Sequence, residues 1–158
     1  MKGHDEIIDT LNTLLADELT AINQYMVHSE MCDDWGYARL HEYIEKRAID
    51  EMKHAEKLIG RILFLEGTPI VTELKRIHIG DAVPKQLGND RRSEEEAIGA
   101  YNGAIRLAVE VGDNGTRELL EAILTDEEAH LDWLESQLDQ IDQMGVENYL
   151  AQQIRDSG

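Results

Sequence analysis

The sequence predicts an all-α protein: an antiparallel four-helix bundle with a long crossover between its second and third helices and a short fifth helix. Three observations lead to this fold. The 158 residues include two prolines, apolar residues recur at helical spacing along four long stretches, and the two halves of the chain repeat each other at an offset of 76 positions. We expect one domain, residues 1–158, with helices over about residues 5–33, 36–66, 82–111, 114–144 and 146–155.

Composition narrows the class of protein. The formal net charge of −18 argues against a nucleic acid or an anionic membrane as partner and is typical of a protein that attracts cations. The single cysteine, Cys32, excludes an intrachain disulfide and a thiolate metal cluster within one chain. The first residues lack the apolar core of a signal peptide, and no uncharged apolar run reaches the roughly 20 residues of a membrane span. We therefore expect a cytoplasmic protein.

In the first helix, apolar residues such as Leu15 and Ile22 form a stripe, and Glu18 occupies the gap between them. A carboxylate on a buried face is costly unless it is paired or binds a metal ion, so Glu18 is a candidate ligand. The helix should end at residues 33–36, where an aspartate can cap the next helix.

The second helix carries Glu51 and His54 at positions of its inward stripe where apolar residues are expected. Residues three positions apart share one face of a helix. Glu18 and Glu51 are equidistant from the proposed turn, so they should meet about 25 Å from it in an antiparallel hairpin, at a rise of about 1.5 Å per residue.

The second half repeats this pattern. Gly67, Pro69 and Gly80 interrupt the helical spacing and indicate the long crossover. Asp81 is a candidate cap for the third helix, with Pro84 in its first turn. Both the offset and the apolar stripe select one glutamate from the run 94–96, which is Glu94.

The fourth helix carries Glu127 and His130, each 76 positions after Glu51 and His54. Gly145 is suited to end this helix. The tail that follows is amphipathic and too short to be stable alone, so we expect it to dock, for example onto another subunit.

Four glutamates and two histidines at these places are the ligand set of a dinuclear metal centre inside a bundle: Glu18, Glu51, His54, Glu94, Glu127 and His130. Hard carboxylates with imidazole favour iron or manganese, and zinc is also compatible.

Further residues are candidates around this centre. Asp50 and Asp126 each precede a site histidine by four residues and can accept its second ring N–H, on their own or on the facing helix. Tyr25 either passes an electron to the centre or is a core tyrosine whose hydroxyl bonds a neighbour. Met52 faces away from the metal, because one residue turns about 100° around a helix. Its thioether can ligate haem iron or pack against a subunit.

The whole chain resembles the bacterioferritins, the haem-containing branch of the ferritin-like superfamily. The matching segments are residues 1–3, 23–25, 34–36, 49–55, 61–67, 126–128 and 147–150. The resemblance implies iron storage: oxidation of Fe²⁺ by O₂ or H₂O₂ at the six-residue site, with Glu51 and Glu127 bridging two irons, and ferric mineral inside a homo-oligomeric cage of 24 subunits. It also implies haem b between subunit pairs with Met52 as axial ligand, a ferredoxin as reductant for iron release, and a fifth helix that lines pores.

One departure from the family pattern concerns iron transfer at the inner surface. Many members carry a histidine near Asp50, and Lys46 stands there in this chain, so that transfer is in doubt. The alternative function is another di-metal carboxylate oxidase or peroxidase without storage. A rubrerythrin-like enzyme is disfavoured, because its iron domain needs several cysteines. A structural shell that uses the metal only as a staple is the third possibility.

Overall fold

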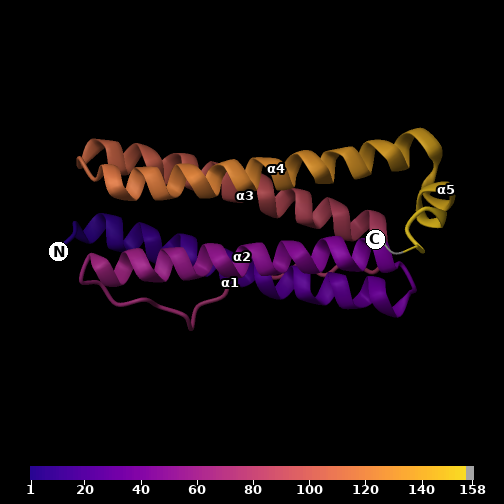
Figure 1. Cartoon of the computed structure of the whole chain (residues 1–158), viewed down its shortest axis with the longest axis horizontal. Helices are drawn as coiled ribbons and strands as arrows, with labels where there is room; N and C mark the ends of the chain where they lie inside the picture. Colours follow the sequence, from indigo (N-terminus) through magenta and orange to yellow (C-terminus); the bar gives the residue numbers. More distant parts are fainter. Residues whose placement is uncertain (156–158) are drawn as a thin grey trace.

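The computed structural model describes residues 1–155, and within them the chain forms five helices and no strand. The helices are α1 (Asp5–Asp34), α2 (Ala38–Phe64), α3 (Val83–Glu110), α4 (Asn114–Met144) and α5 (Val146–Ala151) (Figure 1). The predicted fold class is therefore confirmed.

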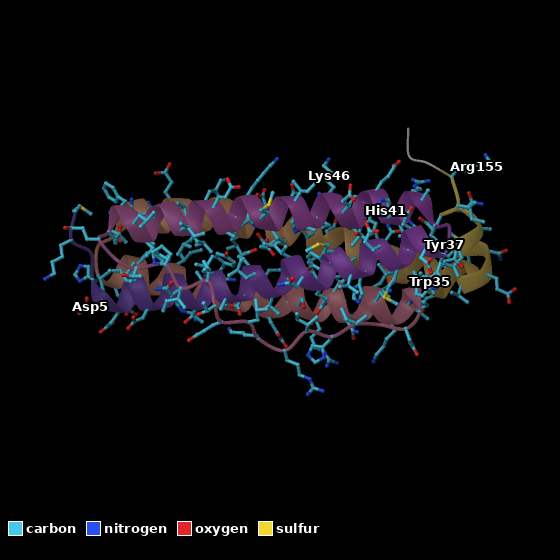
Figure 2. All side chains as sticks on the ribbon, turned by 90° about the horizontal axis from the view of Figure 1, so that it is seen from below. Asp5, Trp35, Tyr37, His41, Lys46 and Arg155 are labelled. Atoms are coloured by element: carbon cyan, nitrogen blue, oxygen red, sulfur yellow. The ribbon has the colours of Figure 1, made fainter. Side chains whose placement is uncertain are left out.

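The four long helices form two hairpins that lie side by side. Helix α1 packs along α2 and α3 along α4, and the hairpins meet through α1 with α3 and α2 with α4. The crossover leaves the end of α2, returns along the bundle and enters α3 at the opposite end, so α2 and α3 run in the same direction (Figure 1). Trp35 and Tyr37, in the α1–α2 turn, lie at the α5 end, far from Asp5 (Figure 2).

The two hairpin turns share one geometry. Helix α1 ends with the Tyr37 N–H donating to the Cys32 carbonyl at 2.9 Å and the Gly36 N–H donating to Asp33 at 3.0 Å. Gly36 has φ 84°, a left-handed conformation that favours glycine. This hydrogen-bond pattern satisfies the last carbonyls of the helix. Gly112, at φ 74°, repeats it at the α3–α4 turn.

The predicted aspartate caps of the second and third helices are wrong. Helix α2 begins two residues late, and no side chain caps it, because Asp33 and Asp34 belong to α1 and Tyr37 occupies the cap position. Helix α3 begins after Ala82, not Asp81, and it too lacks a side-chain cap, although Pro84 does lie in its first turn. Of the helix starts within residues 1–155, that of α4 is capped by an aspartate, Asp113, whose carboxylate accepts from the Thr116 N–H.

The fifth helix is shorter than predicted and docks on its own chain. It ends at Ala151, not near residue 155. Its Tyr149 is buried and donates to Gln137 Oε1 of α4 at 2.6 Å. The carbonyl of Gln153 accepts from the Arg39 N–H at 3.0 Å, so the residues after α5 bind the start of α2 instead of extending the helix. Gly145 ends α4 with φ 83°, at the expected position.

Polar side chains of α1 hold the crossover, which lacks regular structure of its own. Four backbone N–H groups of the crossover, at Ile70, Lys75, His78 and Gly80, donate at 2.8–3.0 Å to side chains of Asn12, Thr20, Gln24 and His28. In a segment outside helices and strands, backbone N–H groups need other acceptors, and these side chains provide them; the Gly80 donor is buried, where a missing partner would be costly.

The core is divided into two apolar clusters. One surrounds Leu11, Leu58 and Ile123, and the other surrounds Leu40 and Leu134. A layer of buried charged side chains lies between them and is described below. None of the helices in residues 1–155 has both the length and the hydropathy of a membrane span.

Asp113 provides a test of how the second hairpin is held. Its carboxylate accepts from Thr116 and from Arg61 Nη2, the latter at 2.9 Å. Burial alone would raise the pKa of Asp113, but the hydrogen bonds from Thr116 and Arg61 hold it below its usual value. We expect Asp113→Ala to lower the free energy of unfolding at pH 7 by about 1–2 kcal/mol, measured by urea denaturation of metal-free protein.

The pH dependence follows from the lowered pKa. A depressed folded pKa gives stability that is present above the unfolded pKa of about 3.9 and is lost as the pH falls through the folded value. The difference between wild type and variant should therefore shrink below about pH 4. Asp34→Ala is the control: Asp34 is exposed at the end of α1, beside the other turn, and its substitution should have little effect. Equal losses in both variants would contradict the capping role.

Candidate metal centre

Six buried side chains converge at one level of the bundle. Helix α1 supplies Glu18, α2 supplies Glu51 and His54, α3 supplies Glu94, and α4 supplies Glu127 and His130. Each is 1–2% exposed. The helices place them there because every one of these residues occupies a position of an inward stripe, so the candidate ligands named from the sequence all lie together.

These side chains form two overlapping groups of potential ligands. Glu18, Glu51, His54 and Glu127 make one group, and the other consists of Glu51, Glu94, Glu127 and His130. Within each group the ligand atoms lie within 4.8 Å of one another. Glu51 and Glu127 belong to both groups. The arrangement therefore offers two adjacent cation positions, each with its own glutamate and histidine and with two carboxylates in common.

The buried polar atoms of the centre are poorly satisfied by the protein itself. Within residues 1–155, five of them lack a hydrogen-bond partner: Glu18 Oε2, Glu51 Oε1, Glu94 Oε2, Glu127 Oε1 and His130 Nδ1. His130 Nδ1 approaches Glu51 Oε1 to 3.0 Å, but without the angles of a hydrogen bond. Unpaired buried carboxylate oxygens are costly. Carboxylate oxygens with two imidazole nitrogens are a donor set that suits iron or manganese.

Two tyrosines hold the glutamates that are not shared. The Tyr25 hydroxyl of α1 donates to Glu94 Oε1 of α3, and the Tyr101 hydroxyl of α3 donates to Glu18 Oε1 of α1 at 2.5 Å. Tyr25 thus has the contact of a core tyrosine that bonds a neighbour. Tyr101 lies 76 positions after Tyr25, so the repeat in the sequence is enough to identify Tyr101 as its counterpart.

Two aspartates face the outer nitrogens of the histidines. Nε2 of His54 is 2.9 Å from Asp126 Oδ2, and Nε2 of His130 is 3.5 Å from Asp50 Oδ2. Each aspartate therefore faces the histidine of the facing helix and not the one on its own helix. The sequence had left both possibilities open. These contacts leave both Nδ1 atoms directed at the glutamates.

The electrostatics of the metal-free centre favour bound protons. Burial, followed by the neighbouring Glu18, raises the pKa of Glu51 well above its usual value. Burial and the adjacent carboxyl group of Glu94 raise the pKa of Glu127 to about 9. Burial alone would lower the pKa of His54, but the adjacent carboxylates of Glu127 and Glu18 raise it to about 10. Protons thus offset the negative charge where no cation does.

Openings lead toward the centre from two sides. Between α1 and α3, beneath the crossover, a cavity of about 320 Å³ reaches Glu18 and Glu94 from a mouth where Lys75 pairs with Asp17. Between α2 and α4, a cavity of about 240 Å³ reaches His54 and His130. Lys46 is exposed on α2 (Figure 2) and lines neither cavity.

One buried polar cluster beside the centre has no counterpart in the sequence analysis. His28 Nδ1 donates to Asp90 Oδ1 at 2.9 Å, and Gln24 Nε2 donates to the same oxygen at 2.8 Å. At the offset of 76, His28 corresponds to Ala104 and Asp90 to Leu14. Both residues break the repeat, so the repeat does not reveal them.

Comparisons with known proteins show which proteins this chain is similar to. Residues 8–144 match the family model described as Ferritin-like domain. The chain is 45% identical over 155 residues to the Bacterial ferritin of Pseudomonas aeruginosa, covering 98% of this chain and 100% of that protein. It is 43% identical over 152 residues to the Bacterioferritin of Mycolicibacterium paratuberculosis (96% of each chain) and 40% identical over 149 residues to that of Rhodobacter capsulatus (94% and 92%).

Metal binding should release protons. The pKa values of His54 and Glu127 are raised to about 10 and about 9 in the metal-free protein, so both groups hold protons at pH 7, and metal ligands must give them up. We expect addition of Co²⁺ to metal-free protein at pH 7 to release more than one proton per chain. The release should fall as the pH approaches the raised values. Measurement by pH-stat in unbuffered solution checks this, and cobalt binding without proton release would contradict it.

Proposed function

The chain belongs to the bacterioferritin family, and on that premise we propose that it stores iron: it oxidises Fe²⁺ to Fe³⁺ at the buried centre and deposits ferric mineral inside a 24-subunit cage. The observation that carries the ferroxidase proposal is the pair of four-residue ligand groups that share Glu51 and Glu127. A centre of this kind holds two irons close together, so that two one-electron oxidations can serve a single oxidant, O₂ or H₂O₂.

Each part of the site has a role in this proposal. Glu18 with His54, and Glu94 with His130, would each hold one ferrous ion, and Glu51 with Glu127 would bridge the pair. Tyr101 and Tyr25 fix the carboxylates of Glu18 and Glu94 by hydrogen bonds. The net charge of −18 supports the role, because it raises the local concentration of divalent cations.

We extend the proposal to haem b between pairs of subunits, with Met52 as axial ligand. The Met52 side chain is 47% exposed, and Ile49, one turn earlier on α2, is also exposed and apolar. A thioether on an apolar surface fits the axial ligand of a haem that is shared with a second copy of the chain. Such a haem would carry electrons for the reduction and release of stored iron, with a ferredoxin as donor, in the cytoplasm.

The alternative is a di-metal carboxylate oxidase or peroxidase that keeps two metal ions and stores none. The same six ligands would serve it. The two functions differ in the amount of iron bound and in the size of the assembly.

The first test counts iron. We expect wild-type protein, loaded with Fe²⁺ under nitrogen and then given O₂, to retain far more than two irons per chain and to elute as a large assembly. Glu127→Ala removes a ligand common to both positions. It should slow ferrous oxidation at least tenfold, measured by the absorbance of the ferric product.

Glu128→Ala is the matched control, because Glu128 is exposed on the same turn of α4, and its rate should stay near wild type. Retention of about two irons by a monomer or dimer would favour the oxidase or peroxidase. A wild-type rate in Glu127→Ala would exclude this centre as the site of oxidation.

The second test concerns haem. We expect Met52→Leu, after saturation with haem, to lose or shift the Soret band of the wild type, because leucine offers no sulfur to the iron. Met144→Leu changes another exposed methionine and should leave the spectrum unaltered. Identical Soret bands in wild type and Met52→Leu would reject Met52 as the ligand.

A further inference from the structure

Arg47 breaks the repeat that relates the two halves of the metal centre. Its counterpart 76 positions later is Ile123, a buried apolar residue. We propose that Arg47 is a positioning residue that makes the two metal positions unequal: by binding Asp50 it weakens the Glu94–His130 position relative to the Glu18–His54 position. This inference rests on the dinuclear centre of the proposed function.

The Asp50 carboxylate lies closer to Arg47 than to His130. Arg47 Nη2 lies 2.9 Å from Asp50 Oδ2, and His130 Nε2 lies 3.5 Å from that same oxygen. An N–H···O hydrogen bond is normally about 2.7–3.2 Å long, so the contact with His130 is too long for a normal hydrogen bond. In the other half, Asp126 Oδ2 is 2.9 Å from His54 Nε2.

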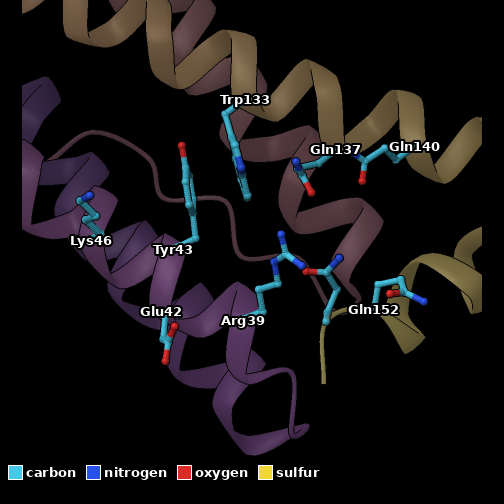
Figure 3. A pocket seen from close by; sticks show the side chains of 9 residues that line it. Arg39, Glu42, Tyr43, Lys46, Trp133, Gln137, Gln140 and Gln152 are labelled. Carbon is cyan, nitrogen blue, oxygen red and sulfur yellow. The ribbon is translucent and has the colours of Figure 1, made fainter. Parts of the chain in front are cut away.

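Arg47 is placed by ring contacts and not by a hydrogen bond to its Nε, which is buried without a partner among residues 1–155. Its guanidinium carbon lies 4.8 Å from the centre of the Tyr43 ring, a cation–π contact. Tyr43 of α2 stacks on Trp133 of α4, with ring centres 3.7 Å apart and planes at 12°, and the two rings face each other in Figure 3. Arg47 also lines a small cavity together with Glu94 and His130. Arg47 also borders the cavity that reaches both histidines, so the Glu94–His130 position is distinguished by this second, small cavity, which neither Glu18 nor His54 lines.

Arg47 weakens cation binding at the Glu94–His130 position in two ways, through its contact with Asp50 and through its charge. A carboxylate that accepts the outer N–H of a histidine fixes the ring and makes it a better metal ligand, and loss of such a contact typically costs 10- to 100-fold in metal affinity. The guanidinium charge also opposes a cation nearby. We expect the Glu94–His130 position to bind a divalent cation about tenfold more weakly and to be the last filled and the first emptied.

The exposure of the two aspartates reduces the expected difference in affinity between the metal positions but does not reverse it. The Asp126 side chain is 53% exposed and that of Asp50 27%, so water competes more for Asp126. A formed hydrogen bond at 2.9 Å nevertheless outweighs a contact at 3.5 Å, because hydrogen bonds weaken steeply with length. Lys53 and Lys57 border the cavity that reaches both histidines, so they do not distinguish the two positions.

The test measures the occupancy of each position with Co²⁺, which accepts carboxylate and imidazole ligands. Crystals of the full chain are equilibrated with Co²⁺ below saturation, and anomalous diffraction gives the two occupancies. In the wild type we expect the Glu18–His54 position to be filled in about tenfold preference. Arg47→Ile installs the residue found in the other half and should bring the two occupancies to within about twofold. Arg47→Met retains a straight side chain over Tyr43 and is the second variant if Arg47→Ile does not fold.

Asp126→Ala is the matched control, and it should lower occupancy at the Glu18–His54 position while the other position keeps its affinity. Equal filling in the wild type, or a preference that persists in the Arg47 variants, would overturn the inference and leave the proposed function intact. Absence of cobalt from both positions in the wild type would overturn the proposed centre itself, and the inference with it.

Discussion

The constraint on which the structure depends is the burial of four carboxylates in the middle of a helical bundle. Glu18, Glu51, Glu94 and Glu127 occupy positions where a bundle normally places leucine or isoleucine, and apolar clusters lie on either side of them. Such a layer contributes little stability by itself, and unpaired charges there oppose folding. The tyrosines, the histidines and bound protons reduce this cost in the metal-free protein. Two cations would reduce it further, which explains why so costly a layer is compatible with a stable fold.

The contacts around the centre cross between the hairpins. Tyr25 of the first hairpin holds Glu94 of the second, while Tyr101 of the second holds Glu18 of the first. The aspartates cross in the same way to the histidines. Each hairpin therefore supplies the glutamate and histidine of its own metal position, and the tyrosine and aspartate that contact the glutamate and histidine of the other position. Neither hairpin alone contains a complete position, because both positions need Glu51 from one hairpin and Glu127 from the other.

The sequence predicted the fold and the place of the six candidate ligands because both depend on periodicity. Helical spacing determined the inward face, and the offset of 76 selected Glu94 from three consecutive glutamates. The missed features depend on contacts between distant segments. Whether Asp50 serves its own histidine or the facing one depends on how α2 and α4 are rotated against each other. Helix α5 is short because Gln153 binds Arg39, and α1 extends through Asp34, so that Tyr37 and not an aspartate precedes α2. His28 and Asp90 lie outside the repeat, so periodicity carries no information about them.

The side chains that hold the crossover also bear on the order in which the chain becomes structured. Asn12, Thr20, Gln24 and His28 all belong to α1, which precedes the crossover in the chain. During synthesis on a ribosome, the first hairpin and the crossover can acquire these backbone contacts before α4 has emerged. The crossover then delivers α3 to the correct end of a preformed surface. This favours pairing of the two halves of one chain over exchange of hairpins between neighbouring chains, a hazard for any protein whose halves are so alike.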